Sequence, residues 1–404
     1  MGREVMVCDV LVVGGGAAGV SAAVRAGREG MRAVLIEKGE YLGGVGVRGM
    51  HRFICGLYAN GEDPPKGTLN AGLAEEVSKA LVRRAPHREV RRVGRVYVLP
   101  VAREDLVATF GLLSERAEGL RVLYNTRAVN VGMDGGRIVW MTVRGARSEF
   151  DIVPGAVVDC SGDGVVVQMS GAGHETVPAD QRQLAGYTFR VERLRCRDGT
   201  LPVRVPYYMR KGVEEKGMAP YLRFTTYVPG DDPEGGYCKL NVVPWGEDSD
   251  ERARRDAEMV HSYLSQVLAP FGGSRIAEMS TGVAHRDGVR VHGEYTLTTD
   301  DVLGGRHFSD GAVKSAWPIE LWDQERGPSW RYLEPGRHYE IPLRCLKVRH
   351  ISNCWCAGRC ISATHDALGS TRAMGTCISL GEQAGREAAC YMKRKRATTL
   401  KIEA

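Results

Sequence analysis

The residues best suited to chemistry at the start of the chain are three glycines and one acid. Gly14, Gly16 and Gly19 fit the pattern GxGxxG, and Glu37 follows them after about 20 residues. In such a turn the first glycine permits a tight bend, the second admits a pyrophosphate to the backbone, and the third lets a helix touch a strand. Glu37 can accept both ribose hydroxyls and would repel a 2′-phosphate, which argues against NADP. The spacing therefore predicts a dinucleotide site.

The segments around these residues have the character of a βαβ unit. Residues 8–13 are apolar and read as a buried parallel strand, residues 18–29 as a helix of small side chains, and residues 32–36 as a second strand. The start of such a helix points unpaired N–H groups at phosphates. We therefore expect the flanking residues Ala17, Ala18 and Lys38 to contact the nucleotide as well.

A second glycine-rich loop distinguishes FAD from NAD. Residues 41–49 follow the ribose acid directly and include Gly43 and Gly44. In FAD enzymes of the glutathione reductase type, a loop at this place follows the phosphates and the ribityl chain, whereas NAD dehydrogenases usually continue into a helix and a strand. The loop favours FAD.

The rest of the chain predicts an insertion between two parts of one nucleotide-binding fold. The 404 residues suggest about two domains. Helices are expected at 70–85, 103–118 and 248–269, hairpin strands at 93–99, 128–133 and 137–145, and strands at 120–125, 150–159, 184–193, 221–228, 237–243 and 290–298. The tail predicts a strand at 354–357 and a long helix at 373–392. The fold class is α/β, a Rossmann-type FAD-binding domain (1–170 and 351–404) with an inserted, mainly β substrate or capping domain (171–350).

Three stretches carry a resemblance to a known family. They are residues 13–44, the segment from Arg286 to Leu297 with 301–303 after it, and the tail from Ala357 to Gly385. The turn from Asp159 to Gly164 fits the same pattern. The sequence resembles the FAD-dependent oxidoreductases of the fumarate-reductase/HdrA-like superfamily, which implies flavin redox chemistry.

The resemblance also implies which residues hold FAD. Beyond the amino-terminal unit these are Ser161, Gly162, Asp163, Gly358 and Arg359, with Ser370, Arg372 and Met374 near the isoalloxazine ring. Val129 belongs to a strand and loop that usually pack near the adenine.

Hydride transfer at flavin N5 needs a polarising group and often a proton carrier. The candidates for this role are His51, Arg286, His292, Tyr295, His350 and His365, of which we favour His51, Arg286 and His365. The alternative for either histidine is a purely structural hydrogen bond, and His51 or Cys55 is also a candidate for covalent attachment of the flavin.

Two arginines point to an anionic substrate. Arg286 and Arg290 alternate on an expected strand, so both can face inward toward an anion. The alternative is that they pair with buried carboxylates such as Asp287 or Glu294.

Composition restricts the partners. The net charge of +6 is mild for 404 residues and does not indicate nucleic acid, and no apolar stretch is long enough to span a membrane. Eleven scattered cysteines predict a reducing, cytoplasmic location. The spacing of Cys354, Cys356 and Cys360 matches no standard metal pattern, so no metal is expected.

These expectations favour a FAD-dependent oxidoreductase that transfers a hydride to or from a small organic substrate. A single GxGxxG gives no second nucleotide unit, so an external electron carrier or O2 completes the cycle. The alternative function is a FAD-binding electron-transfer subunit that passes electrons to a partner protein. Oligomerisation is left open.

Overall fold

A central sheet of seven strands organises the described chain. The computed structural model describes residues 3–195, 198–246 and 248–403. The sheet has the order β6-β2-β1-β9-β8-β7, and β20 pairs with β9. Its strands are β1 Val5–Val13, β2 Ala33–Ile36, β6 Leu120–Leu123, β7 Arg127–Asp134, β8 Arg137–Arg144, β9 Glu149–Asp159 and β20 Cys354–Cys356. Strands β6, β2, β1, β9 and β20 are parallel, and β8 and β7 continue the sheet as an antiparallel hairpin. This confirms the predicted α/β fold.

The helices of this part cover the sheet. They are α1 Ala17–Arg28, α2 Gly44–Arg48, α3 Leu73–Arg84, α4 Arg103–Glu115, α5 Val165–Met169, α9 His365–Thr371 and α10 Met374–Glu403. Val10, Leu11 and Val12 of β1 are fully buried, as expected for a parallel strand covered on both faces. A small sheet, β3 Phe53–Ile54, β5 Val96–Pro100 and β4 Arg91–Val93, lies beside the helices.

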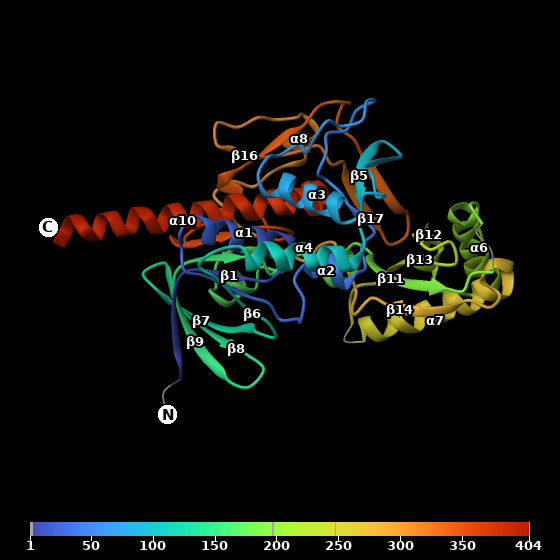
Figure 1. Cartoon of the computed structure of the whole chain (residues 1–404), viewed down its shortest axis with the longest axis horizontal. Coiled ribbons are helices and arrows are strands. Elements are labelled where there is room, and N and C mark those ends of the chain that lie inside the picture. Colours follow the sequence, from blue (N-terminus) through green and yellow to red (C-terminus); the bar gives the residue numbers. More distant parts are fainter. Residues whose placement is uncertain (1–2, 196–197, 247, 404) are drawn as a thin grey trace.

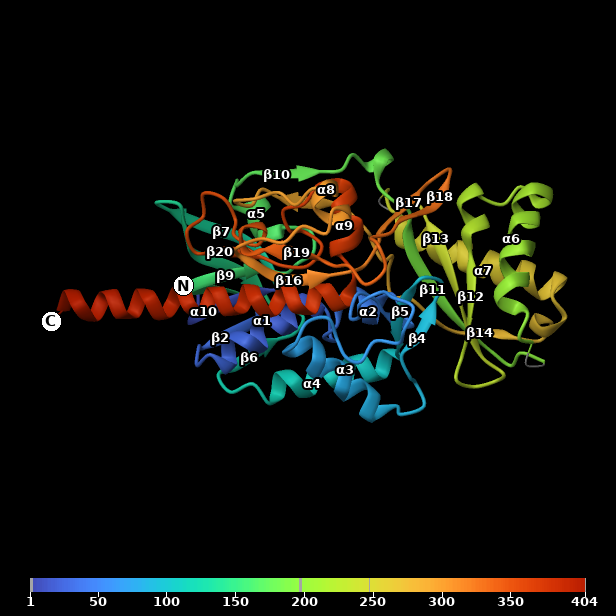
Figure 2. The same ribbon diagram turned by 90° about the horizontal axis from the view of Figure 1, so that it is seen from above.

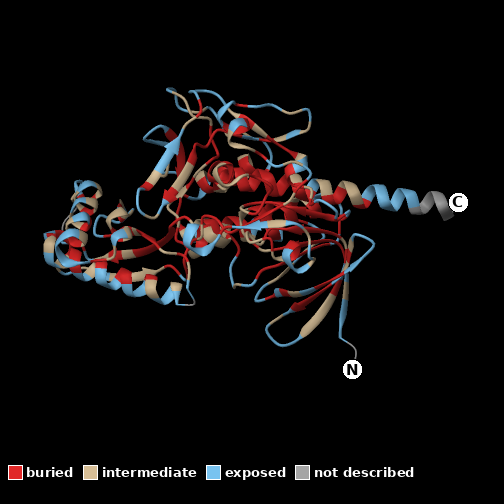
Figure 3. Cartoon of the chain, turned by 180° about the vertical axis from the view of Figure 1, so that it is seen from behind, coloured by how far each residue is buried: buried red, intermediate tan, exposed pale blue. Residues whose placement is uncertain are grey.

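The last helix lies directly on the first one, although they are far apart in sequence (Figures 1 and 2). A side chain at Gly381 would overlap the carbonyl of Ala18, and one at Gly385 would overlap the carbonyl of Ala22. Glycine at these two positions therefore allows the close backbone contact that attaches the tail to the amino-terminal unit. The carboxyl end of α10 projects beyond the body and becomes exposed (Figure 3).

A second unit forms at the end of the molecule opposite this projecting helix (Figure 1). Its four-stranded antiparallel sheet has the order β12-β13-β11-β14, from β11 Ala185–Glu192, β12 Thr226–Pro229, β13 Gly236–Val242 and β14 Arg275–Met279. Helices α6 Leu201–Lys216 and α7 Ser249–Val267 pack on it, with short 3-10 turns at Ala179–Gln181, Pro220–Phe224 and Ala269–Phe271. This unit has its own hydrophobic core, drawn from residues between Ala185 and Val283.

Three further two-stranded antiparallel sheets lie outside these two sheets. They are β10 His174–Thr176 with β15 Val289–Val291, β16 Gly311–Ser315 with β19 Tyr339–Pro342, and β17 Ile319–Asp323 with β18 Gly327–Arg331. Helix α8 Thr299–Leu303 and a 3-10 turn at Leu343–Cys345 connect them. Their buried residues, such as Tyr339 and Ile341, belong to the first core. The domain boundaries near residues 170 and 350 stay a prediction.

Local expectations and structure differ in a few places. The expected strand at 221–228 is a 3-10 turn up to Phe224 and then β12, because Pro220 favours the start of a helical turn. The expected strand at 290–298 is only the short β15. Helix α6 was not predicted; Pro206 lies inside it. Among the described residues, no helix is long and apolar enough to cross a membrane.

Candidate cofactor and substrate site

The glycine turn lies between β1 and α1, where the sequence predicted it. Gly14 has a φ of +98°, and a side chain there would lie 2.7 Å from the carbonyl oxygen of Cys160. A side chain at Gly19 would overlap the carbonyl of Gly14. Beside Gly16 there is open space, and no side chain caps the start of α1. The turn thus offers a free helix N-terminus, beginning at Ala17 and Ala18, with room for an anionic group.

Glu37 lies at the end of β2 next to this turn. Its carboxylate accepts the N–H of Gly15 at 2.6 Å and the N–H of Gly39 at 2.8 Å, and the side chain is buried. Lys38 is the next residue. The Glu37 carbonyl accepts the N–H of Thr126 at 2.9 Å, which brings the chain leading into β7, and so Val129, to the same edge of the sheet.

The second glycine loop packs directly on the first. Gly43 donates its N–H to the carbonyl of Gly15 at 2.8 Å, and Gly44 begins the short helix α2 beside Gly16. The side chain of Met374, at the start of α10, occupies the space beside Gly46 of α2. The glycine turn, the second glycine loop and the start of α10 are therefore in contact with one another and form one surface.

The tail closes over this surface. Gly358 lies against Ala18, and Arg359 forms an ion pair with Asp163 at 2.6 Å. Burial alone would raise the pKa of Asp163, but the Arg359 charge outweighs burial and holds the pKa below its usual value. Gly162 lies beside the same guanidinium. The two segments that the family resemblance assigned to FAD are thus held together by an ion pair.

Two serine hydroxyls, of which that of Ser370 is buried, anchor the loops behind this surface. Ser161 donates its hydroxyl to Asp159 at 2.6 Å. The Ser370 hydroxyl lies 2.6 Å from that of Tyr339 and donates to the carbonyl of Trp317 at 2.5 Å. Both hydroxyls have protein partners and position the backbone around them.

Beyond Met374 the structure assembles a cluster of charges around Trp322. Arg286 stacks on the Trp322 ring at 4.2 Å from its centre, and the Lys239 ammonium is 5.4 Å from it. Arg372 donates to the carbonyl of Glu320 at 2.8 Å. We call Lys239, Arg286, Glu320 and Arg372 the charged cluster. It contains three cations and one carboxylate, contributed by β13, the segment before β15, β17 and the end of α9.

Hydrogen bonds fix the arginine of the cluster. Arg286 donates to Asn241 Oδ1 at 2.8 Å and to the carbonyl of Leu184. Burial, and then the Arg372 charge, lowers the pKa of Arg286 to about 9. Arg286 is 7% exposed, whereas Arg372 keeps intermediate exposure. The predicted inward orientation of Arg286 therefore holds, while Arg290 pairs with Glu175 at 2.7 Å instead.

Lys239 is the cluster member with a titration near neutral pH. Burial, and then the charge of Arg286, lowers its pKa to about 8. Burial alone would raise the pKa of Glu320, but Arg372, Lys239 and Arg286 together keep it below its usual value. The cluster thus holds an ionised carboxylate and an amine that exchanges protons readily.

His51 and Cys55 lie on the loop that passes this cluster. Burial, followed by the Lys239 charge, lowers the pKa of His51 to about 3, so its imidazole is neutral at neutral pH. Burial, followed by the Glu320 charge, raises the pKa of Cys55 to about 12, which keeps it a thiol. The Cys55 carbonyl accepts the N–H of Gly375 at 2.8 Å and ties the loop to the first turn of α10.

His365 lies at the start of α9, next to the charged cluster. Its Nε2 is 3.4 Å from Asp287 and its Nδ1 is 3.2 Å from Asp366. The nearby Asp287 carboxylate raises the pKa of His365. A surface recess of about 300 Å³ opens beside it, lined also by Thr298 and Thr364.

Sequence reasoning did not select Lys239, Asn241, Glu320, Trp317 or Trp322. The signal was available, because Lys239 and Asn241 alternate with buried residues on an expected strand, so polar side chains fall on one face. Glu320 and Trp322 alternate in the same way on a strand that was not expected.

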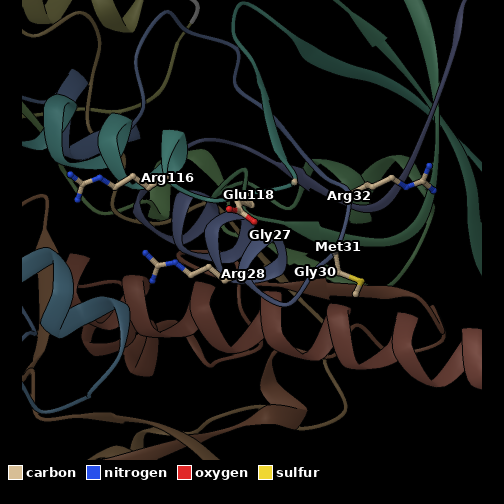
Figure 4. Close-up of a pocket in the computed structure, with 8 residues that line it drawn as sticks. Gly27, Arg28, Gly30, Met31, Arg32, Arg116 and Glu118 are labelled. Atoms are coloured by element: carbon tan, nitrogen blue, oxygen red, sulfur yellow. The ribbon is translucent and has the colours of Figure 1, made fainter.

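A second surface recess is unrelated to this site. Figure 4 shows a hollow of about 400 Å³ lined by Gly27, Arg28, Met31 and Arg116. It lies at the carboxyl end of α1, whose 12 residues span about 18 Å from the glycine turn.

The fold and the two packed glycine loops define a flavin-binding enzyme of the α/β class. The open space at Gly16, the uncapped start of α1 and the acid at Glu37 fit FAD. The chain belongs to the FAD dependent oxidoreductase family, which matches residues 9–403. It is therefore an oxidoreductase with FAD as its cofactor.

Solved structures with this fold include several flavoproteins. CabE, an aromatic hydroxylase from angucycline biosynthesis, is 11% identical with a TM-score of 0.54, over 96% of this chain and 63% of CabE. The flavin-dependent brominase Bmp2 is 14% identical with a TM-score of 0.50, over 96% of this chain and 80% of Bmp2. A geranylgeranyl bacteriochlorophyll reductase-like protein (Ta0516) from Thermoplasma acidophilum is 13% identical with a TM-score of 0.47, over 99% of this chain and 84% of that protein. The likenesses to CabE and Bmp2 show a shared fold. No curated protein matches the sequence.

Proposed function

We propose that the enzyme transfers a hydride between FAD and a small anionic organic substrate held by the charged cluster. Bound FAD supplies the chemistry, accepting or giving a hydride at N5. The observation that carries the proposal is the composition of the cluster. Lys239, Arg286 and Arg372 bring three positive charges against the Glu320 carboxylate and the neighbouring Asp287 carboxylate, whose charge acts on both arginines. The cations therefore remain in excess.

A small carboxylate would relieve this imbalance. Guanidinium groups bind carboxylates through two parallel hydrogen bonds, and a desolvated site strengthens such pairs. Arg286 is already fixed by Asn241 and by stacking on Trp322, so little freedom is lost when it binds an anion. We assign substrate orientation to Arg286 and Arg372.

Lys239 and His51 take different parts in the proposal. Lys239, with its pKa of about 8, carries the proton that accompanies hydride transfer. His51, with a pKa of about 3, stays neutral and acts as a hydrogen-bond partner. His365 is bound to Asp287 and Asp366, and we assign it a positioning role for the loop before α9.

The alternative from the family resemblance is an electron-transfer subunit, as in the HdrA-like group, in which a partner protein and not a small molecule exchanges electrons with FAD. A cluster of fixed, partly accessible charges favours a small-molecule site instead. Hydroxylation or halogenation, the activities of CabE and Bmp2, is not supported by any residue described above.

The test is anaerobic flavin spectroscopy of the purified FAD protein with single small molecules, starting from both oxidised and dithionite-reduced flavin. We expect one or more hydroxycarboxylates to bleach the oxidised flavin, or one or more unsaturated carboxylates to reoxidise the reduced flavin, with the corresponding amides and esters inactive. Arg286→Met is expected to raise the apparent KM for the active carboxylate by at least about 100-fold, the loss of a charged hydrogen bond of about 3 kcal/mol. Arg223→Met, an arginine on the surface of the inserted unit, is the control.

Flavin that responds only to a redox partner protein would favour the electron-transfer alternative. An equal response to acids and their amides would contradict the anionic substrate while leaving FAD chemistry intact.

A further inference from the structure

A group of three side chains that could bind a metal lies beside the two-stranded sheet β16–β19, apart from the charged cluster. His307, His338 and Glu340 place one ligand atom each within 4.8 Å of one another. Among the described residues it is the one such group of three histidine, cysteine or acidic side chains. No motif in the sequence predicts this group, because His307 lies far from the other two residues along the chain.

Strand alternation directs two of these side chains to the same face. His338 and Glu340 flank Tyr339, whose side chain is fully buried and reaches Ser370 with its hydroxyl. Because neighbouring strand residues point to opposite faces, His338 and Glu340 both face away from the core. The buried Tyr339 side chain fixes the register of β19 and so fixes the side to which the His338 and Glu340 side chains point.

The loop after α8 brings His307 to them. The N–H of Glu340 donates to the carbonyl of Arg306 at 2.9 Å, and the carboxylate of Glu340 accepts the N–H of Phe308 at 2.9 Å. The backbone on both sides of His307 is therefore tied to Glu340. His307 Nδ1 is 3.3 Å from Glu340 Oε1, and the His307 and His338 rings are 5.0 Å apart.

Two details favour a ligand at this position. A side chain at residue 311 would overlap the Glu340 carboxylate, so Gly311 leaves room for that carboxylate to turn toward the histidines. The Nε2 atom of His338 is buried and has no hydrogen-bond partner among the described residues. A buried ring nitrogen without a partner costs free energy that a bound cation would recover.

We propose that His307, His338 and Glu340 bind one divalent transition-metal ion of the zinc class. Two histidines and a carboxylate are a known zinc ligand set, and metal–ligand bonds of about 2.0–2.2 Å place tetrahedral ligands about 3.3–3.6 Å apart. The separation of His307 Nδ1 and Glu340 Oε1, 3.3 Å, already has this value, and the ligand atoms of all three residues lie within 4.8 Å of one another. The His307 side chain is 61% exposed, so a fourth position opens to solvent.

The site would act by fixing one loop. A bound ion joins the segment around His307 to β19, and the opposite face of β19 holds Ser370 through Tyr339. The ion thus stiffens the hairpin that lies behind the loop leading to Arg372. This role is independent of flavin chemistry.

A neighbouring cation provides a specific control. Lys314 lies directly opposite Glu340 in the β16–β19 pair, and its charge reaches His338. An approaching metal ion is repelled by this ammonium. Lys314→Ala should therefore tighten metal binding, which a general loss of structure would not do.

The experiment is calorimetric titration of the chelator-treated, FAD-loaded protein with Zn²⁺, and separately with Mg²⁺. We expect one Zn²⁺ per chain and no Mg²⁺ binding, because imidazole ligands favour transition metals. His307→Ala and His338→Ala should each weaken Zn²⁺ at least about 10- to 100-fold, the loss seen even for outer partners of metal ligands. His87→Ala, an exposed histidine elsewhere, should bind as the parent does.

A second measurement distinguishes loss of the metal site from misfolding of a variant. Zn²⁺ should raise the Tm of the parent and of Lys314→Ala, and should leave the Tm of His307→Ala unchanged. Absence of saturable Zn²⁺ binding, or equal binding by His307→Ala and the parent, would overturn the proposal.

Discussion

The indole N–H of Trp322 donates to Glu320 Oε1 at 2.6 Å, and this bond fixes the one carboxylate in the charged cluster. Trp317 donates to the other oxygen at 3.2 Å. With both oxygens held, Glu320 cannot turn away from Arg286, Arg372 and Lys239. The cluster is therefore preorganised, and its charge excess is a fixed property of the fold.

Removing this carboxylate should destabilise the protein. Glu320→Ala leaves three cations without their shared partner, and we expect the free energy of unfolding to fall by about 3 kcal/mol. Urea unfolding followed by circular dichroism measures it. Glu325→Ala, in the turn of the same hairpin, should change stability by less than about 0.5 kcal/mol. Equal stabilities of the two variants would show that the cluster is not coupled through Glu320.

Adding one methyl group at Gly16 should separate cofactor binding from folding. No protein atom lies near the position of the new carbon, so Gly16→Ala should fold normally. The methyl group would occupy space that the phosphates need, and FAD affinity should fall at least about tenfold. Flavin absorbance of the purified variant, with circular dichroism as the folding check, measures both effects.

Gly111→Ala is the matched control for this change. Gly111 lies in α4, also with no atom near the added carbon. It should keep its flavin and gain up to about 1 kcal/mol from helix propensity. A yellow Gly16→Ala protein with the parent's FAD affinity would contradict the placement of the phosphates at this turn.

The raised pKa of His365 predicts a stability that declines with increasing pH. The nearby Asp287 carboxylate raises the pKa above its ordinary value of 6.5, so protonated His365 stabilises the folded state. This contribution is complete below 6.5 and is lost as the pH rises through the higher folded value. Urea unfolding from about pH 5.5 to about pH 8.5 should show the decline, and His365→Gln should flatten it. His87→Gln should keep the slope of the parent.

The lowered pKa of Lys239 predicts the pH dependence of anion binding. The ammonium is present below its pKa of about 8 and lost above it, so carboxylate affinity should fall as the pH rises through this value. Lys239→Arg keeps its charge and should extend binding to higher pH, whereas Lys239→Met should bind weakly at every pH. Difference spectra of the bound flavin with the active carboxylate measure the affinity. A parent profile that is flat across this range would remove Lys239 from the site.

Much of the cofactor part followed from local rules. Strand β1, helix α1 and strand β2 match the expected ranges closely, because an apolar strand, a glycine turn and a small-residue helix each depend on neighbouring residues. The packing of Gly381 on Ala18 also depends on residue size, which the sequence displays. The sequence therefore predicted the cofactor but not the substrate of the enzyme.

The charged cluster and the histidine group could not be predicted in this way. Lys239 and Glu320 belong to strands of different sheets, and His307 meets Glu340 only because a loop bends back onto β19. Such contacts between distant residues depend on long-range packing, which no local sequence pattern predicts. Arg286 and Arg290 illustrate the point. The strand on which they were expected to alternate is only β15 Val289–Val291, so Arg286 lies before it, and Arg290 within it pairs with Glu175.

By itself, the sequence predicted a dinucleotide site at Gly14–Gly19, because glycine is required wherever backbone and phosphate approach closely. It also determined the α/β fold, because hydrophobic periodicity is a local property. Only the tertiary structure decided which charges surround Trp322, and that Arg286 faces them while Arg290 does not. The physical reason is that the balance of three cations against Glu320 arises from segments distant in sequence, and their distances exist only once the sheets have packed together.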